Sequence, residues 1–263
     1  MKKKILRTLS ALCLCLQSLS ANAAEGIVTF SYPVQPQHRN ANVNYSLNPQ
    51  SEKFYVWTPP DFSKNQTYGL IVYIPPIDAC NMPQGWADVL AKRKFLFVAP
   101  QNAGNSVLNP RRSGLAVMAA LEMVHEYKID NRRIYTAGLS GGARLAASCA
   151  FWQHDIFSGT IQSCGSNYYR PVAPNYATTS TDTNGHPYNV ADGTSAEDAS
   201  AARSAVKFCL ITGAGDFRRG NILDIYNNGF TVDGFRAKLI DVPGMGHQDC
   251  SGHVLEQALD FLQ

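Results

Sequence analysis

The amino-acid sequence predicts an α/β fold, in which helices flank a mainly parallel central sheet within a single domain. Short β-rich runs alternate with longer helical patterns along the chain, which is the order of elements found in βαβ units. Hydrophobic residues make up 45% of the 263 positions and charged residues 16%, so the chain can fill a large core. No internal repeat or hydrophilic linker divides the sequence into two such cores.

The first 23 residues have the features of a secretory signal peptide. Four basic residues between positions 2 and 7 precede a short apolar run, and Ala21-Asn22-Ala23 places small residues at both cleavage subsites. We therefore expect a mature domain of residues 24–263 that is exported, either to a periplasm or out of the cell. Loss of the four basic residues changes the formal charge from +3 to −1, which argues against nucleic-acid binding. No apolar stretch of 18 residues follows, so we expect no membrane span.

The strands and helices are predicted from their patterns in chain order. Gly26–Val34 and Glu52–Pro59 have the composition of early strands, and Tyr68–Ile74 is an uninterrupted apolar run typical of a buried central strand. The other predicted strands are Phe95–Pro100, Arg133–Ala137, Phe157–Ser163, Val206–Thr212 and Phe235–Val242. The predicted helices are Gln84–Lys94, Arg112–Tyr127, a helix from just after Ser140 to about Phe151, one between the last two strands, and Gly252–Leu262.

A polar segment of about forty residues, 166–205, interrupts this order before the penultimate strand. It is rich in Ser, Thr, Asn, Asp and Gly with little periodicity, and it holds Tyr168, Tyr169, Tyr176 and Tyr188. Structureless segments of this length are usually lids, binding loops or disordered insertions. Two interpretations stay open, a solvated surface loop and a cap that faces the substrate.

Five cysteines remain after removal of the signal peptide: Cys80, Cys149, Cys164, Cys209 and Cys250. We expect no bridge between Cys149 and Cys164, because the first lies about 13 Å along its helix from Ser140 and the second near the catalytic end of a strand. Cys80 is better placed to meet Cys164 or Cys250. The sequence has no CxxC and no Cys/His cluster at metal-ligand spacing, so we expect no metal site and no cofactor.

The turn after the predicted strand Arg133–Ala137 has the pattern G-x-S-x-G, in Gly138-Leu139-Ser140-Gly141-Gly142. In such a strand-to-helix turn the serine takes a strained conformation, and side chains two positions either side would collide with neighbouring elements, so both positions need glycine. The helix that begins after the serine offers free N–H groups where an oxyanion would form. The pattern indicates Ser140 as a nucleophile. The alternative is a glycine-rich turn whose serine only caps the helix.

A catalytic serine requires a base and an acid, which follow it here in the order acid, histidine. His247 comes after the last predicted strand across a glycine-rich loop, at the sheet edge where catalytic groups of α/β proteins gather. Asp216 lies just past the strand Val206–Thr212 and is preferred as the acid over Asp224, which lies inside a helical segment. The other histidines precede the sheet, lie near helix ends, or fall in the polar segment or the last helix: His38, His125, His154, His186 and His253.

Four stretches carry a resemblance to a known family: Asp130-Asn131-Arg132-Arg133-Ile134-Tyr135-Thr136-Ala137-Gly138-Leu139-Ser140-Gly141-Gly142, Phe157-Ser158-Gly159-Thr160, Gly213-Ala214-Gly215-Asp216-Phe217 and Val242-Pro243-Gly244-Met245-Gly246-His247. From about Tyr68 to the C-terminus the chain resembles α/β-hydrolases, specifically the secreted esterases related to polyhydroxybutyrate depolymerases and feruloyl esterases. The resemblance implies the α/β-hydrolase fold, with Ser140 as nucleophile, His247 as base and Asp216 as acid.

One departure from the family concerns the oxyanion hole. Family members carry His-Gly after the third strand, whereas this chain has Pro75-Pro76. Because proline has no N–H, alignment with the family implies Ile77 as one oxyanion donor, with Gly141 as the other.

The predicted reaction is hydrolysis of a carboxylic ester through an acyl-enzyme intermediate, without a metal or organic cofactor. Tyr168, Tyr169 and Trp86 are candidate substrate-binding residues, because their flat rings would suit an aromatic or polymeric ester. Two alternatives stay open. A serine peptidase of the same fold would use the same triad, and an exported binding module would keep the fold without the chemistry.

Overall fold

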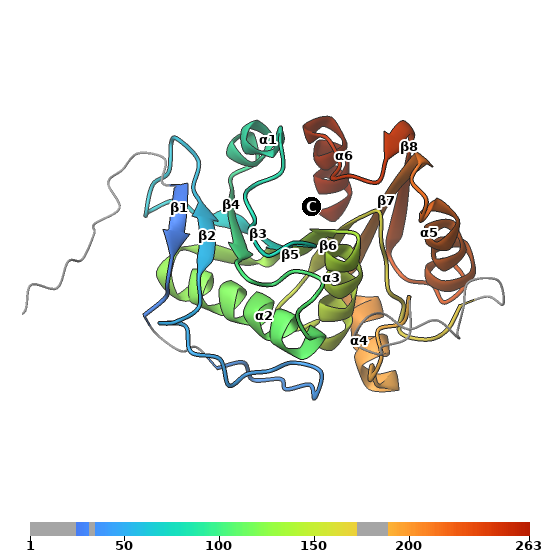
Figure 1. Ribbon diagram of the computed structural model, residues 1–263, viewed down its shortest axis with the longest axis horizontal. Coiled ribbons are helices and arrows are strands. Elements are labelled where there is room, and N and C mark those ends of the chain that lie inside the picture. The colour runs from blue at the N-terminus through green and yellow to red at the C-terminus, as the bar shows by residue number, and fades with distance from the viewer. Residues whose placement is uncertain (1–24, 32–34, 173–188) are drawn as a thin grey trace, which may run out of the picture.

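The computed structural model describes residues 25–31, 35–172 and 189–263 (Figure 1). The predicted signal peptide, residues 1–23, lies outside the described residues, as do Tyr176, His186 and Tyr188 of the polar segment. The predictions made for these positions stay predictions.

The described residues form one eight-stranded sheet in the order β1-β2-β4-β3-β5-β6-β7-β8. β1 (Glu25–Val28) and β2 (Phe54–Trp57) pair antiparallel, and β2 is also antiparallel to β4. The remaining strands are parallel to one another: β3 (Tyr68–Ile74), β4 (Phe95–Pro100), β5 (Ile129–Leu139), β6 (Gly159–Ser163), β7 (Lys207–Gly215) and β8 (Ala237–Gly246). The prediction of a mainly parallel central sheet is confirmed.

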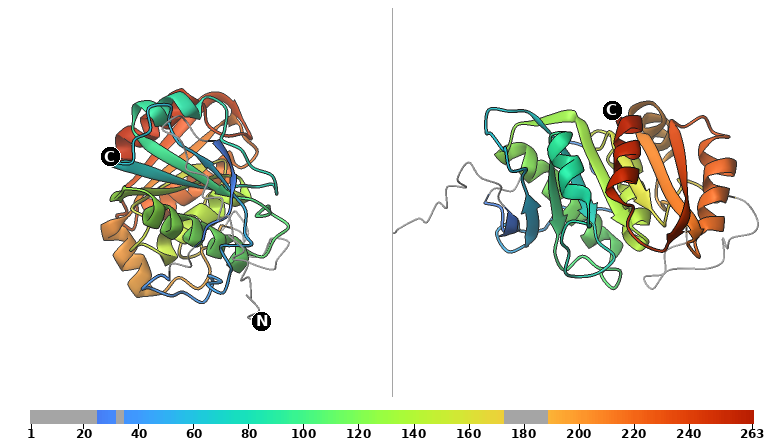
Figure 2. Two further views of the ribbon diagram at one scale, coloured as in Figure 1. Left: turned by 90° about the vertical axis from the view of Figure 1, so that its left-hand side faces the viewer. Right: turned by 90° about the horizontal axis from the view of Figure 1, so that it is seen from above.

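Helices cover both faces of this sheet, with α1 and α6 on one face and α2 and α3 on the other (Figures 1 and 2). Because successive side chains of a strand point to opposite faces, β3 sends Leu70 and Val72 into one core and Ile71 and Tyr73 into the other. The helical elements are α1 (Trp86–Lys92), α2 (Asn109–Glu126), α3 (Gly141–Trp152), α4 (Ala196–Ala205), α5 (Arg219–Ile225), the π-helical turn η1 (Tyr226–Phe230) and α6 (Gly252–Leu262).

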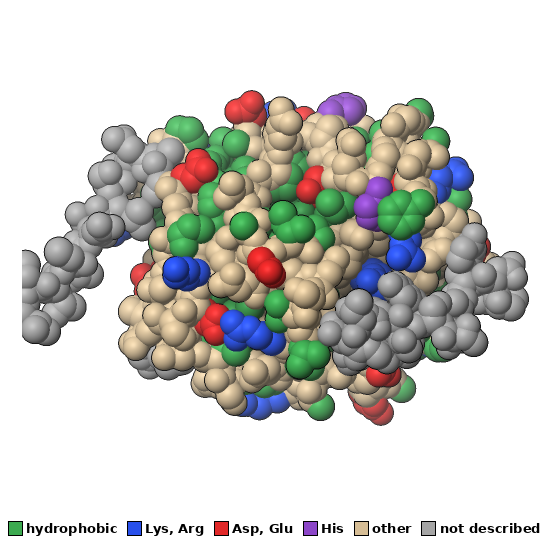
Figure 3. Space-filling model, in the orientation of Figure 1, with side chains coloured by type: hydrophobic (Ala, Val, Ile, Leu, Met, Phe, Trp, Pro, Cys, Tyr) green, Lys and Arg blue, Asp and Glu red, His purple; other side chains and the backbone are tan. Residues whose placement is uncertain are grey.

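The charge of the surface and the character of the helices can be compared with the sequence predictions on net charge and on membrane spans. In the view of Figure 3, acidic and basic side chains are dispersed among hydrophobic ones, in keeping with the small net charge. None of the helices in the described ranges has both the length and the apolar character needed to cross a membrane.

The polar segment contains an element that the sequence prediction missed. Its end, Ala196–Ala205, is helix α4 rather than irregular chain. The hydroxyl of Ser195 accepts a hydrogen bond of 3.0 Å from the amide of Asp198, which is an N-cap, and acidic side chains occupy the first turn. The prediction of an irregular segment was therefore wrong for α4, whose capping serine was visible in the sequence.

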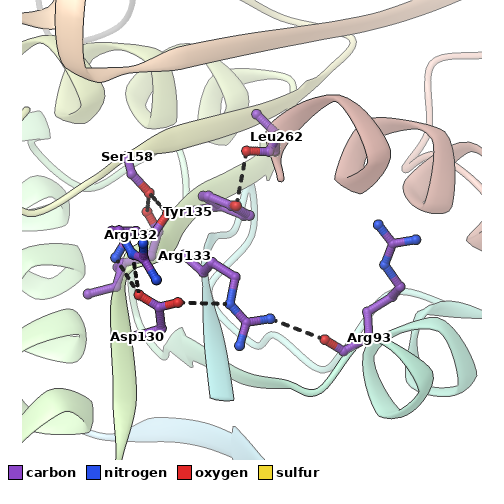
Figure 4. A network of polar contacts seen from close by, with 8 residues as sticks. Arg93, Asp130, Arg132, Arg133, Tyr135, Ser158 and Leu262 are labelled. Atoms are coloured by element: carbon purple, nitrogen blue, oxygen red, sulfur yellow. Dashed lines mark hydrogen bonds and ion pairs between the residues drawn. The ribbon is translucent and has the colours of Figure 1, made fainter. Parts of the chain in front are cut away.

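A polar network lies at the start of β5, at the opposite end of the strand from Ser140 (Figure 4). Asp130 pairs with the guanidinium groups of Arg132 and Arg133, at 3.3 and 3.4 Å. The hydroxyl of Ser158 donates to the carbonyl of Arg132 at 2.8 Å, which joins the loop before β6 to β5. In the stretch that resembles the family, Asp130, Arg132 and Arg133 thus hold the start of β5 in place.

All five cysteines of the described chain are buried and free. Cys149 and Cys164 do not pair, as the helix geometry predicts. Cys80 forms no bridge to Cys164 or Cys250 either. Its backbone amide donates to the side chain of Gln101 at 3.0 Å, and its carbonyl accepts from that side chain at 2.9 Å. The fold therefore holds without a disulfide in the described residues.

Candidate active site

Four neighbouring parallel strands each end one residue before a chemically active side chain. β5 ends before Ser140, β6 before Cys164, β7 before Asp216 and β8 before His247. Because the strands are parallel and in the order β5-β6-β7-β8, these four residues lie along one edge of the sheet. The pairing of Gly215 with Gly246 brings Asp216 and His247 side by side.

Ser140 has the strained backbone of a nucleophile turn. Its φ is 57° and its ψ −116°, a region that residues with a side chain rarely adopt. Its amide donates to the carbonyl of Ser163 at 2.8 Å, which fixes the turn against the end of β6. Strain of this kind persists only where the surrounding structure enforces it, so the conformation points to a function for Ser140 rather than simple capping.

The glycines on either side of Ser140 are required by close contacts. A Cβ added to Gly138 would lie 2.7 Å from the carbonyl oxygen of Ile74, and one added to Gly142 would overlap the same atom. The end of β3 thus leaves no space for a side chain at either position. This agrees with the reason that the sequence analysis gave for glycine two positions either side of the serine.

His247 and Asp216 form a direct hydrogen bond, with 2.7 Å between Nδ1 of the histidine and Oδ1 of the aspartate. The carboxylate also accepts bonds from the hydroxyl of Thr212 at 2.7 Å and from the amide of Arg218 at 3.0 Å. Asp216 is almost fully buried, so its carboxylate is held in place by three donors. Asp224, the competing acid, lies inside α5 rather than directly after a strand of the sheet.

Burial alone would raise the pKa of Asp216, but the hydrogen bonds from His247, Arg218 and Thr212 outweigh it and hold the pKa below its ordinary value. The group is therefore a carboxylate at neutral pH and can only accept hydrogen bonds. It follows that Nδ1 of His247 donates to Asp216, which leaves Nε2 as the ring nitrogen outside this bond.

Ser140 lies at the same edge but is not yet bonded to the histidine. Within the described ranges its hydroxyl forms no hydrogen bond with His247. Such bonds are often long in substrate-free enzymes and tighten when substrate binds. The structure therefore joins Asp216 to His247 directly and places Ser140 on the same edge, two strands from Asp216 and three from His247.

The predicted oxyanion donors lie on two neighbouring elements. Gly141 is the first residue of α3, so its N–H has no acceptor within the helix. Ile77 lies in the loop after β3, where the residue is 64% exposed. That loop is held by the buried guanidinium of Arg112, whose Nη2 donates to the carbonyl of Pro75 at 2.9 Å, and by the amide of Asn105, which donates to the carbonyl of Pro76 at 2.9 Å.

Several solved structures have the same architecture. A ferulic acid esterase matches 92% of this chain over 97% of its own, with 16% sequence identity and a TM-score of 0.63. The chain has an α/β-hydrolase fold. A fluorophosphonate-binding serine hydrolase, FphF of Staphylococcus aureus, matches 92% of the chain over 98% of its own, with 11% identity and a TM-score of 0.64. The poly(3-hydroxybutyrate) depolymerase LpqC of Bordetella parapertussis matches 90% over 88%, with 14% identity and a TM-score of 0.58.

The likeness is confined to structure. No protein-family model matches the sequence, and no curated protein matches it either. At these identities the solved structures establish the α/β-hydrolase fold, which confirms the fold that the sequence resemblance implied.

Two residues beside the pair of His247 and Asp216 were given no role in the site by the sequence analysis. Phe217 stacks on His247 with 4.2 Å between ring centroids, yet 72% of Phe217 is exposed. Cys164 lies under the pair, with its Sγ and the ligand atoms of Asp216 and His247 all within 4.8 Å of one another. Their positions in the sequence could have indicated that they lie near the site. Cys164 directly follows β6, and Phe217 lies two residues after the end of β7.

The tentative substrate residues have other partners. Trp86 is fully buried at the start of α1, where its Nε1 donates to the carbonyl of Cys250 at 2.8 Å. Tyr168 is fully buried too, and its hydroxyl donates to Asp233 at 2.7 Å. Tyr169 is half-buried and bonds to the same carboxylate oxygen at 2.9 Å. The prediction of substrate contacts is therefore wrong for Trp86 and Tyr168, because neither has surface to offer.

The two tyrosines instead anchor the start of the polar segment. Tyr168 packs on Phe230 of η1 with 4.7 Å between ring centroids, and Arg170 joins Tyr168 and Tyr169 on Asp233 through its Nε at 2.9 Å. The hydrogen bond from Arg170 lowers the pKa of Asp233 to about 2. Sequence could not separate this role from a substrate-binding one, because the partner Asp233 lies 65 positions from Tyr168.

Proposed function

We propose that this chain is an exported serine esterase that hydrolyses carboxylic esters through an acyl-enzyme intermediate on Ser140. The observation that carries the proposal is the 2.7 Å bond between His247 and Asp216, formed on the same sheet edge as the strained Ser140. Solved proteins with the same fold include esterases and a serine hydrolase that binds fluorophosphonates, which supports this class of reaction.

In the acylation step, Nε2 of His247 takes the proton of the Ser140 hydroxyl while Oγ attacks the carbonyl carbon of the ester. Asp216 keeps the imidazole in the required tautomer and stabilises the positive charge that the ring acquires. The carbonyl oxygen becomes an oxyanion, which the amides of Gly141 and Ile77 would hold. Collapse of this intermediate expels the alcohol, which receives the proton from His247.

In the deacylation step, water replaces the alcohol. His247 takes a proton from the water as it attacks the acyl-enzyme carbonyl, and the same two amides hold the second oxyanion. The released proton returns to Oγ of Ser140 as the carboxylic acid leaves. Because the residues return to their starting states, the reaction needs water as its only co-reactant.

A fluorophosphonate probe tests the proposal. We expect it to label Ser140, with the site identified by peptide mass spectrometry, and to leave Ser140→Ala unlabelled. The protein should hydrolyse p-nitrophenyl butyrate faster than aminoacyl p-nitroanilides. Faster hydrolysis of the anilides would favour the same-fold peptidase, and absence of both labelling and turnover would favour the binding module.

Export requires a separate test. Expression of the full chain in a Gram-negative host should yield a protein that is recovered from the periplasm or the medium and begins at Ala24 by N-terminal sequencing. Retention of Met1 in a cytoplasmic product would contradict this part of the proposal without affecting the esterase activity.

A further inference from the structure

A second group of histidine and aspartate side chains converges away from the catalytic edge. His38 lies in the segment between β1 and β2, His154 just after α3, and Asp198 in the first turn of α4. The Nε2 atom of each histidine lies 3.4 Å from Oδ1 of Asp198, and the three ligand atoms all lie within 4.8 Å of one another. The two imidazole rings are 5.4 Å apart between centroids.

The distances in this cluster fit a shared metal ion better than direct hydrogen bonds. A charge-assisted bond between imidazole and carboxylate is about 2.7–2.9 Å long, and the catalytic pair has that length, at 2.7 Å. Around a tetrahedral Zn²⁺ with bonds of about 2.1 Å, neighbouring ligand atoms are separated by about 3.4 Å. Both histidines of the cluster lie at that separation from the carboxylate oxygen.

The donor set selects the class of ion. Two imidazoles and one carboxylate suit Zn²⁺ and similar transition-metal dications, whereas Ca²⁺ and Mg²⁺ prefer sites made of oxygen atoms. The side chain of Asp198 is 11% exposed, while the side chains of His154 and His38 are 19% and 35% exposed. The carboxylate thus forms the floor of the cluster, and its outer side is open to a water molecule as the fourth ligand.

The three segments are already joined by bonds that do not involve the cluster itself. Asn42, four positions after His38, donates through Nδ2 to the carbonyl of Asp192 at 2.8 Å. Trp152, at the end of α3, donates through Nε1 to the hydroxyl of Thr194 at 3.1 Å. These contacts hold the ligand-bearing segments together, so the site is formed before an ion arrives.

We propose that His38, His154 and Asp198 bind a divalent transition-metal ion of the Zn²⁺ type. The ion would tie the segment before β2 to the end of α3 and the start of α4. α3 has 12 residues, so its two ends are about 18 Å apart. Since Ser140 lies at the other end of α3, the ion would support the fold and take no part in ester hydrolysis.

The experiment uses untagged, EDTA-treated protein, because a polyhistidine tag would itself bind zinc. Calorimetric titration with Zn²⁺ should give one tight site, and Zn²⁺ at about 100 times its Kd should raise the Tm by about 5 °C. His38→Gln and His154→Gln should each weaken Zn²⁺ binding by more than about 100-fold, the upper end of the loss seen when a second-shell partner is removed. Both variants should keep wild-type turnover of p-nitrophenyl butyrate in the absence of Zn²⁺.

Two control variants locate the ion. His253→Gln removes an exposed histidine of α6 and should bind Zn²⁺ as the wild type does. His247→Gln breaks the other group of ligand atoms, formed with Cys164 and Asp216, and should also retain the tight site. Loss of binding in His247→Gln with retention in His154→Gln would assign the ion to the catalytic edge and overturn the proposal. A wild type that binds no Zn²⁺ at micromolar concentration would overturn it as well.

Discussion

In the part of the chain that the structure describes, histidine meets aspartate at two places near opposite ends of α3, and the two places differ in how the carboxylate is satisfied. Asp216 accepts bonds from His247, from the Thr212 hydroxyl and from a backbone amide, and its distance to His247 is 2.7 Å. Within the described ranges the side chain of Asp198 accepts no hydrogen bond, and it lies 3.4 Å from two imidazoles. The carboxylate of Asp216 is fully hydrogen-bonded and therefore orients a single imidazole ring, that of His247. The carboxylate of Asp198 keeps lone pairs that can bind a metal ion together with the two imidazoles beside it.

The largest effect is expected from a variant that removes the proposed nucleophile, Ser140, and leaves both histidine–aspartate sites intact. Ser140→Ala should lower kcat on p-nitrophenyl butyrate by about 10⁴-fold or more, because the members of a triad act as a unit. Steady-state kinetics measures the loss, and circular dichroism checks that the fold is kept. Residual turnover above one hundredth of wild type would mean that another residue is the nucleophile.

The matched pair Asp216→Asn and Asp198→Asn tests the comparison directly. Asp216→Asn should lower kcat by about 10³- to 10⁴-fold, because an amide permits the wrong tautomer of His247. Asp198→Asn should leave kcat within about twofold and abolish the stabilisation by Zn²⁺. Asp224→Asn serves as a further control, and loss of activity there with normal activity in Asp216→Asn would show that the acid is misassigned.

Asp249 gives a third carboxylate for comparison, two residues after His247, and its hydrogen-bond partner is a tyrosine rather than a histidine. Its oxygens accept from the hydroxyl of Tyr73 at 2.9 and 3.0 Å. Burial outweighs that bond and raises the pKa of Asp249 to about 6. The folded state therefore holds this proton more tightly than the unfolded state, so the stability that Asp249 contributes is full below pH 4 and falls as the pH rises through 6.

Asp249→Asn should remove this dependence. Between pH 4.5 and 7.5 the wild type should lose about 2 kcal/mol of unfolding free energy relative to the variant. Urea denaturation at the two pH values measures the difference. Parallel pH profiles for the two proteins would mean that Asp249 keeps its ordinary acidity in the folded state.

The smallest expected effect concerns Phe217, the exposed ring stacked on His247. Phe217→Ala should lower kcat/KM for aromatic esters by about tenfold, equivalent to about 1.4 kcal/mol, since an aromatic contact contributes about that much. Acetyl esters should change by less than about threefold. Phe217→Leu, which keeps an apolar surface, should lie between the two. Equal losses on every ester would assign Phe217 to positioning His247 rather than to contacting the substrate.

Sequence patterns predicted the parts of the molecule that depend on strand order. Ser140, Asp216 and His247 each follow a parallel strand, and parallel strands end at one edge. The contact between Asp216 and His247, and the place of Ser140 on the same edge, could therefore be anticipated. The environment of Tyr168 and Trp86 could not, because a tyrosine or tryptophan suits a core as well as a cleft. The cluster of His38, His154 and Asp198 was also missed. Its members come from three loops and helix ends whose docking no local spacing encodes.

The five free cysteines have a consequence for observing how the molecule opens. They are buried in different parts of the fold: Cys80 after β3, Cys149 in α3, Cys164 beside Asp216 and His247, Cys209 in β7 and Cys250 before α6. Burial raises the pKa of each thiol, so little thiolate is present while the surrounding structure is closed. Each thiol then reacts with an alkylating reagent only when its own region opens. The order in which mass spectrometry finds them modified would give the order in which the catalytic edge, the sheet and the helix layers come apart.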